Sequence, residues 1–153
     1  MRKLTWDDLL IRDFTREDAH RWLSVWSWLV SGTLTPEFMT KFGDWYLRRP
    51  DGSIEMLDVL EGRLVKVADS VDDFYALVKT QEWQEENLLS LMVYQLHEQG
   101  MVPGAGQCYG FAPHPSISGD MQLEQVMIIE IMAWQTICSE FFLLEQATDD
   151  ECT

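Results

Sequence analysis

The sequence predicts an α+β fold in which an antiparallel β-meander packs with about four to five helices in a single domain. Apolar residues recur at helical spacing up to Ser31, alternate with polar residues across 44–68, and return to helical spacing after Ser70. Turn sequences containing proline or glycine separate the alternating runs. The chain has 153 residues, 46% of them hydrophobic, which is enough to bury one substantial core.

The first part of the chain is expected to be helical. A helix is predicted from Thr15 to Ser31, with a shorter helical piece before it at 7–11. Thr15-Arg16-Glu17-Asp18 is a near capping box in which aspartate takes the position usually held by glutamate. Gly32 ends the helix, because glycine is the residue best suited to follow a helix C-terminus.

The alternating region predicts three strands, at 44–49, 53–59 and 64–68. Pro50-Asp51-Gly52 separates the first two, because proline presets φ and glycine supplies a positive φ. Leu60-Glu61-Gly62-Arg63 forms the second turn. Both connections are short, so the three strands are expected to pair in sequence as an antiparallel meander.

Helices return after the meander. Ser70-Val71-Asp72-Asp73 is the expected N-terminal cap of a helix that buries Phe74, Leu77 and Val78. A second helix is predicted at 85–99, with Gly100 as its end.

The last third of the chain is expected to hold a loop, a strand and a helix. The loop, 101–120, is rich in glycine and proline, and the strand at 123–131 is rich in β-branched residues. The closing helix is predicted at 133–145. Its apolar stripe consists of Trp134, Ile137, Cys138, Phe141 and Leu144.

The net charge of −15 is concentrated in the second part of the chain. Residues 1–50 contain eight Lys or Arg and seven Asp or Glu, whereas residues 51–153 contain three and nineteen, and no cation follows Lys79. Such a distribution repels nucleic acid and anionic membranes, and it accelerates the encounter with a basic protein. The alternative interpretation is that the charge only keeps an acidic protein in solution.

Cysteine usage and apolar run length indicate a cytoplasmic protein in a reducing compartment. Cys108, Cys138 and Cys152 are odd in number and have no CxxC spacing, so neither a disulfide framework nor a zinc ribbon is expected. The longest apolar runs have four to five residues, far fewer than the ~20 that cross a bilayer. Asp7 and Asp8 interrupt the N-terminus before any stretch of signal-peptide length.

The chain is expected not to be an enzyme and to hold no cofactor or metal. Cys108 and His114 share one segment, but no third group is placed to orient them and no nearby cation lowers the thiol pKa. His20, His97 and His114 have no metal-ligand spacing. The glycine-rich stretch 104–110 lacks the GxGxxG spacing of a phosphate loop.

Carboxylates around two expected helix starts are the candidate partner-binding residues. This predicted acidic patch consists of Asp69, Asp72, Asp73, Glu82, Glu85 and Glu86. Carboxylates near a helix N-terminus also stabilise the helix by ~0.3–1 kcal/mol, so a purely structural role stays open beside the functional one. Trp28 lies off the apolar stripe of its helix and is the candidate aromatic anchor for a partner.

Two motifs resemble a known bacterial family. They are Phe42-Gly43-Asp44-Trp45-Tyr46-Leu47-Arg48-Arg49-Pro50-Asp51-Gly52-Ser53, continuing to Gly62, and Cys108-Tyr109-Gly110-Phe111-Ala112-Pro113-His114-Pro115, followed by Gly119. In this order and separation they resemble the C-terminal domain of type VI secretion immunity proteins that protect against a DNase toxin, formerly a domain of unknown function. Broader relatives are immunity proteins of the SMI1/KNR4 kind. The resemblance covers about residues 38–142.

The resemblance implies a non-catalytic protein that neutralises a cognate toxin of the nuclease type by covering its basic active-site face. The partner is then a basic protein, and no direct contact with nucleic acid or membrane is expected. The implied organisation is a helical segment 1–37 packed on an immunity-type α+β domain at 38–146, with an acidic tail at 147–153. The alternatives are a regulatory or scaffolding interaction module unrelated to toxin immunity, and an enzyme using Cys108, His114 or a carboxylate.

Overall fold

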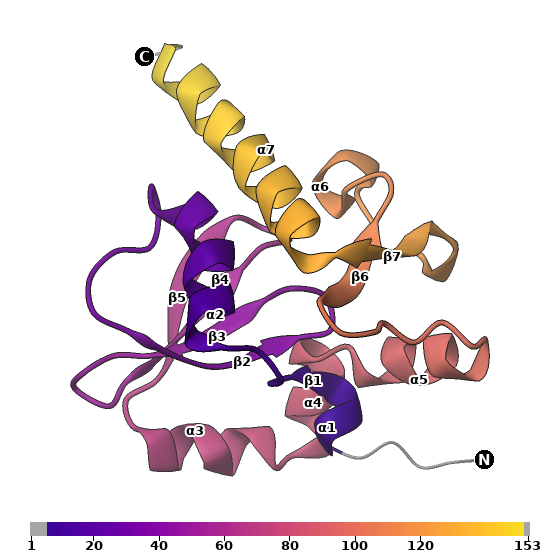
Figure 1. Cartoon of the computed structure of the whole chain (residues 1–153), viewed down its shortest axis with the longest axis horizontal. Helices are drawn as coiled ribbons and strands as arrows, with labels where there is room; N and C mark the ends of the chain where they lie inside the picture. Colours follow the sequence, from indigo (N-terminus) through magenta and orange to yellow (C-terminus); the bar gives the residue numbers. More distant parts are fainter. Residues whose placement is uncertain (1–5, 152–153) are drawn as a thin grey trace.

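The computed structural model describes residues 6–151 and is built around a five-stranded antiparallel sheet (Figure 1). The strands follow one another across the sheet in chain order, and a helical segment lies between the first strand and the second. Their bounds are β1 Leu10–Ile11, β2 Thr35–Thr40, β3 Trp45–Arg48, β4 Ile54–Asp58 and β5 Arg63–Ala68. The predicted three-stranded meander is therefore confirmed as β3, β4 and β5.

Two strands of this sheet were not predicted. β1 has only two residues, and β2 contains Pro36, which cannot donate to a ladder and lies at an irregularity in the register between Pro36 and Phe38. All of β1, but only the beginning of β2, comes from the segment that was expected to be helical. The segment 1–37 thus supplies β1 and the first residues of β2 to the sheet.

The helices lie on both faces of the sheet, and the α+β prediction is confirmed. Those of seven or more residues are α2 Arg16–Leu23, α3 Val71–Val78, α4 Gln81–Asn87, α5 Ser90–Glu98 and α7 Ile131–Glu151. Shorter pieces are α1 Trp6–Leu9, η1 Ser24–Trp26, α6 Pro115–Ser118 and η2 Leu123–Gln125. Within residues 6–151 no helix is long and apolar enough to span a membrane.

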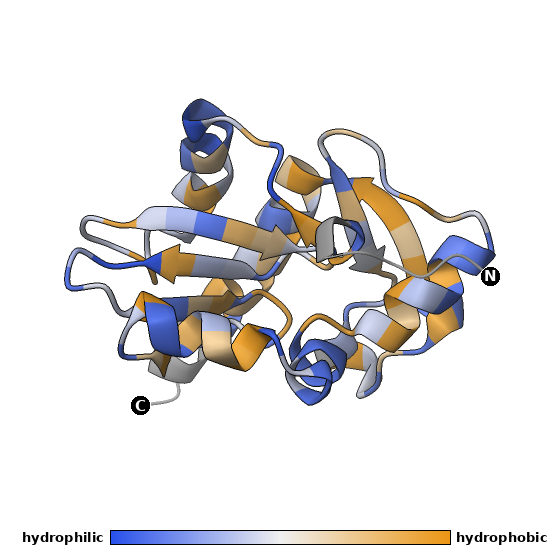
Figure 2. Ribbon diagram, turned by 90° about the horizontal axis from the view of Figure 1, so that it is seen from below, coloured by the Kyte–Doolittle hydropathy of each residue, from blue (hydrophilic) through white to orange (hydrophobic). Residues whose placement is uncertain are grey.

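One face of the sheet packs on α3 and α4, and the other on α2 and α7. Tyr46 on β3 contacts the rings of Phe74 in α3 and Trp83 in α4, with centroids 5.4 and 5.5 Å away. The neighbouring Trp45 points the other way and lies 6.3 Å from Trp22 in α2. This alternation is what a strand buried on both faces requires. Hydrophobic segments run through the strands and the helices around them (Figure 2).

A buried glutamine joins α7 to the sheet. The side-chain oxygen of Gln135 accepts hydrogen bonds from the indoles of Trp26 and Trp45, at 2.7 and 3.2 Å, and its amide donates to the carbonyl of Gly43 at 2.8 Å. Next to it, the Trp134 indole donates to the carbonyl of Phe42 at 3.0 Å. The first family-like motif thus fixes α7 on the sheet.

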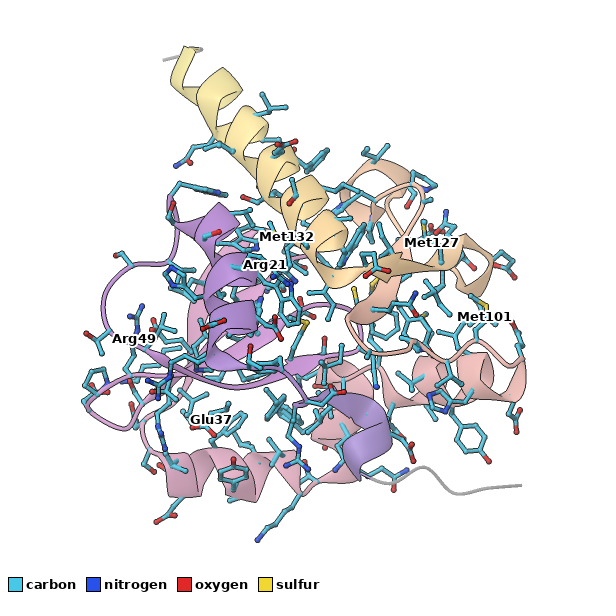
Figure 3. All side chains as sticks on the ribbon, in the orientation of Figure 1. Arg21, Glu37, Arg49, Met101, Met127 and Met132 are labelled. Carbon is cyan, nitrogen blue, oxygen red and sulfur yellow. The ribbon has the colours of Figure 1, made fainter. Side chains whose placement is uncertain are left out.

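Arg49 of the same motif joins the β3–β4 hairpin to the segment that precedes β2. Arg49 donates to the carbonyl oxygens of Ser31 and Thr33 and pairs with Glu55 across the β3–β4 hairpin. Glu37 extends from β2 toward α3 (Figure 3), where it accepts from the Tyr75 hydroxyl at 3.4 Å. These contacts are structural and use no part of the predicted acidic patch.

The first helix is shorter than predicted. Thr15 and Asp18 form the expected capping box, but α2 ends at Leu23 and the chain continues as the 3-10 turn η1. The Ser24 hydroxyl donates to the carbonyl of Arg21 at 2.6 Å. Serine competes for backbone groups in this way and weakens a helix interior. The short piece predicted at 7–11 is present as α1, although Leu10 and Ile11 form β1.

The helix predicted at 85–99 is wrong in part, because the region holds the end of α4 and then, after a break, the whole of α5, which ends at Glu98. Thr80 caps α4 through the backbone N–H of Trp83, and α5 begins after Leu89, which has a φ of +53°. Such a φ is rare for a residue other than glycine and turns the chain sharply. The turn permits Leu88 to be fully buried. The Ser70 cap of α3 is confirmed by its hydrogen bond from Asp73, whereas Leu77 is exposed rather than buried.

The segment predicted as the loop 101–120 is wrong in part, because it contains β6 Gln107–Phe111 and α6. β6 pairs with β7 Val126–Glu130 in a separate two-stranded antiparallel sheet. Gly110 lies within β6, where the backbone packs closely against the Trp134 ring. A Cβ added at this position would lie 2.9 Å from the ring, so a residue without a side chain fits here. Figure 1 shows this small sheet beside the start of α7 and above α5.

The closing helix is longer than predicted and faces differently. α7 runs from Ile131 to Glu151, so the first residues of the expected acidic tail are helical, and 152–153 lie outside the described residues. Trp134 and Cys138 are buried as predicted, whereas Ile137 and Leu144 are exposed. Gln135 and Ser139 occupy buried positions instead, because the helix contacts the sheet through hydrogen bonds as well as apolar packing.

Candidate functional site

The predicted acidic patch is spread along β5, α3 and α4. Asp69 receives an ion pair from Lys66 at 2.7 Å, and both side chains are mostly exposed, so the pair adds little stability. Asp72 and Asp73 are exposed on the first turn of α3. Asp69 and Asp73 line a shallow hollow together with Leu77.

The three glutamates of the patch belong to α4, not to the start of a helix at 85. Glu82 is on the first turn of α4 and exposed, and Glu85 accepts from the side-chain amide of Gln81 at 3.0 Å. Glu86 does not line the hollow beside α3. It lines a separate cleft at the end of α4. The patch therefore divides into an α3 part and a part that approaches this cleft.

This cleft, with a volume of about 520 Å³, lies where the β4–β5 turn, the α4–α5 junction and α6 meet. Five carboxylates and one arginine line it, and we call it the acidic cleft. The charged lining residues are Asp44, Asp58, Glu61, Arg63, Glu86 and Asp120. Its apolar lining includes Met56, Leu60, Leu89 and Met121. Among these residues only Glu86 belonged to the predicted patch.

Asp44 is the most buried carboxylate of the acidic cleft, with 7% of the residue exposed. It immediately precedes β3, and its Oδ1 accepts from the backbone N–H of Val59 at 2.9 Å. Burial and the neighbouring charge of Asp58 raise the pKa of Asp44 well above its usual range, although hydrogen bonds from Val59 and Thr40 oppose this. Within residues 6–151 no cation forms a direct ion pair with Asp44.

Asp58 ends β4 and shapes the turn that borders the acidic cleft. Its Oδ1 accepts from the backbone N–H groups of Leu60 and Glu61, at 3.1 and 3.0 Å. Burial raises the pKa of Asp58, and these backbone hydrogen bonds limit the rise. Gly62 completes the turn with a φ of +70° and lies against Phe142 of α7. The turn therefore needs both the aspartate and the glycine.

Arg63 compensates only part of the negative charge. Its guanidinium lies 2.8 Å from Glu61 and 3.9 Å from Asp58, and the side chain is 60% exposed. Among the described lining residues Arg63 is the one cation, and it contacts two of the five carboxylates. A cleft in which carboxylates outnumber cations in this way is suited to a positively charged group from outside the chain.

Trp28 lies on the opposite face of the sheet from α3 and α4. Its indole N–H donates to the Ser139 hydroxyl of α7 at 2.9 Å, and its ring lies 5.9 Å from that of Trp26. The side chain is half-buried. The structure does not bring Trp28 together with the predicted acidic patch, and its role as an anchor for a partner stays a prediction.

The catalytic alternative based on a thiol finds little geometric support. Cys108 is fully buried in β6, and burial raises its pKa, so the thiolate is disfavoured. His114 stacks on Trp134 and Phe141, with ring centroids 5.6 and 5.1 Å away. Burial lowers the pKa of His114. In the part of the chain that is described, no cluster of side chains is arranged to hold a metal ion.

Sequence reasoning missed most of the acidic cleft. Asp44 precedes one apolar strand run and Asp58 ends the next, and Asp120 comes 62 positions after Asp58 in the chain. A signal was present in the Asp58–Gly62 turn, because aspartate at the start of a turn commonly accepts backbone hydrogen bonds. That signal predicts the turn, but it does not predict which elements pack beside it.

Residues 68–142 match the family described as T6SS immunity protein Tdi1, C-terminal. The matched segment contains the second motif, whereas the first motif precedes it. The crystal structure of Atu4351 from Agrobacterium tumefaciens has a similar fold, with a TM-score of 0.54 and 14% sequence identity. The similarity covers 82% of this chain, and the chain spans 65% of the length of that protein. No curated protein sequence matches the chain.

Proposed function

Residues 68–142 belong to the family of the C-terminal domain of the type VI secretion immunity protein Tdi1, and from this premise we propose that the protein binds and neutralises a cognate toxin. The acidic cleft is the observation that carries the proposal. It offers five carboxylates, carried by the residue before β3, the end of β4, the β4–β5 turn, α4 and the segment after α6, around a cavity of about 520 Å³, with Arg63 as the one cation among the described lining residues. The complementary partner is a protein that presents lysine or arginine side chains.

A nuclease toxin fits this description. An enzyme that cleaves nucleic acid contacts phosphates through cationic side chains, so the face around its active site is basic. An acidic protein can cover that face by supplying carboxylates where the phosphates would lie. Because both surfaces are charged before they meet, the field also speeds association. In this proposal the protein acts by occlusion, without catalysis, and it acts in the cytoplasm, where it meets a toxin that attacks the cell's own nucleic acid.

The proposal predicts that a secreted effector is encoded beside this gene, and the test uses that effector purified in a catalytically inactive form. Cells that produce the active effector should survive only when this protein is also produced. Binding of the inactive effector is measured by surface plasmon resonance at several salt concentrations. Equal killing with and without this protein, together with no binding, would show that the proposed function is wrong.

Three double charge reversals locate the binding surface. Glu61→Lys with Glu86→Lys alters the acidic cleft, Asp72→Lys with Asp73→Lys alters the α3 part of the predicted patch, and Asp13→Lys with Glu17→Lys alters the exposed region beside α2. Each pair reverses two charges and changes the net charge from −15 to −11, since −15 + 4 = −11.

The cleft variant is expected to associate about tenfold more slowly or worse and to show a flatter salt dependence. The α2 variant controls for net charge and should change association by less than about threefold. A stronger effect of the α3 variant than of the cleft variant would move the binding surface to α3. Equal effects of all three would mean that only net charge matters.

A further inference from the structure

The outward side of α7 is more apolar than a solvent-exposed helix requires. Ile137 is 47% exposed and Leu144 is 69% exposed, and the two lie seven residues apart on one side of the helix. The residues that face the sheet are different ones, Gln135, Cys138 and Phe142 among them. α7 extends past the edge of the sheet in Figure 1, so its second half has this outward side open to solvent.

The short helix α6 connects this outward side to the acidic cleft. His114, one residue before α6, stacks on Phe141 at 5.1 Å and so places α6 beside α7. Ile117 of α6 is 66% exposed. Pro115 and the residues that follow α6 line the acidic cleft. One surface therefore runs from the cleft across α6 to α7.

We propose that this surface binds the toxin through its apolar part as well as through the cleft, and that the apolar ridge docks an apolar segment of the toxin flanked by lysine or arginine. The apolar ridge consists of Ile117, Ile137, Phe141 and Leu144. The inference rests on the proposed function and adds the second half of the interface to it. Large apolar side chains exposed together in a polar surround mark interaction sites.

Charge complementarity identifies the occupant of the ridge. Glu140 is exposed on the same helix, one turn from Ile137 and Leu144, and the chain has no Lys or Arg after Lys79. A second copy of this chain would bring the same excess of negative charge against the ridge, since each copy carries −15. Like charges facing each other oppose association, whereas a basic partner is attracted. The occupant is therefore the basic toxin rather than a second copy.

The two halves of the surface have different kinetic roles. Long-range attraction by the carboxylates governs how quickly the partners meet, and desolvated apolar contacts govern how long they stay together. The cleft and the ridge can therefore be separated by measuring association and dissociation rates independently. A typical stable interface buries ~800 Å² on each partner, which is more surface than a single cleft offers.

The test uses Ile137→Ser with Leu144→Ser, measured against the inactive effector by surface plasmon resonance. We expect dissociation to become at least about tenfold faster while association stays within about twofold. Leu77→Ser is the matched control, because Leu77 is 41% exposed on α3, on the opposite face of the sheet. This control should leave both rates unchanged. Ile117→Ser, a single exposed change on α6, should show a smaller increase in dissociation rate.

The outcomes separate the two proposals. If the wild-type protein does not bind the effector, the proposed function fails and the ridge proposal falls with it. If the wild type binds and the double variant, shown to be folded by circular dichroism, dissociates at the wild-type rate, only the ridge proposal is wrong. If sedimentation shows a wild-type dimer that the double variant abolishes, the occupant is a second copy, and the proposal is also overturned.

Discussion

Replacing Gln135 with leucine is expected to destabilise the protein by about 3–6 kcal/mol. The change removes three hydrogen bonds and leaves the indole N–H groups of Trp26 and Trp45 and the carbonyl of Gly43 buried without their partner. Each buried polar group left unsatisfied costs ~1–3 kcal/mol. For the three groups together this cost is ~3–9 kcal/mol. The apolar surface of leucine offsets part of it, so the expected destabilisation lies in the lower part of that range, ~3–6 kcal/mol.

The measurement is urea unfolding followed by far-ultraviolet circular dichroism, because Trp26 and Trp45 would bias a fluorescence signal. Gln146→Leu is the matched control, since Gln146 is an exposed glutamine on the same helix. It should change the free energy of unfolding by less than about 0.5 kcal/mol. A loss of less than about 1 kcal/mol for Gln135→Leu would refute the view that this glutamine is the main polar link between α7 and the sheet.

Two further predictions concern the acidic cleft and the turn beside it. The raised pKa of Asp44 means that the folded state holds this proton more tightly than the unfolded state, so its contribution to stability falls as pH rises above 3.8. In urea unfolding, Asp44→Asn should therefore lose less stability between pH 4 and 7 than the wild type. The difference should be ~1.4 kcal/mol for each unit by which folding raises the pKa of Asp44. Parallel plots of unfolding free energy against pH for the two proteins would contradict this prediction. Gly62→Ala places a Cβ 2.2 Å from the Phe142 ring at a φ of +70°, and should cost more than ~2 kcal/mol in thermal unfolding. Gly52→Ala, which also has a positive φ but meets no atom within 4 Å, should cost only ~1–2 kcal/mol, and equal costs would show that the ring contact is unimportant.

Local chemistry made the turns and caps predictable. Thr15 and Asp18 form a capping box, Ser70 caps α3, and the turns at 50–52 and 60–63 separate β3, β4 and β5. These features depend on the conformational preferences of a few neighbouring residues. Because these preferences can be read from the local sequence, the meander and the starts of α2 and α3 were predicted correctly.

Elements fixed by tertiary contacts were not predictable in this way. β1 and β2 are strands because the sheet pairs with them, and the helical periodicity around 85–99 gave no sign of the break at Leu89. That break requires a positive φ in a leucine, which local preference opposes by ~1–2 kcal/mol. Burial of Leu88 is a compensation that exists only in the folded chain. The acidic cleft depends on the same break, because Leu89 lines it.

The first motif links the stability of the fold to the acidic cleft. Gly43 and Trp45 hydrogen-bond with Gln135, while Asp44 between them projects into the cleft. The motif therefore fixes the helix that carries the apolar ridge and places the most buried carboxylate of the cleft. Burial and, after it, the nearby charge of Asp58 raise the pKa of that carboxyl, and this arrangement destabilises the protein when both carboxyls are charged. Under the proposed function, a lysine or arginine of the toxin relieves this repulsion, so the strain that the free protein carries becomes part of the driving force for binding.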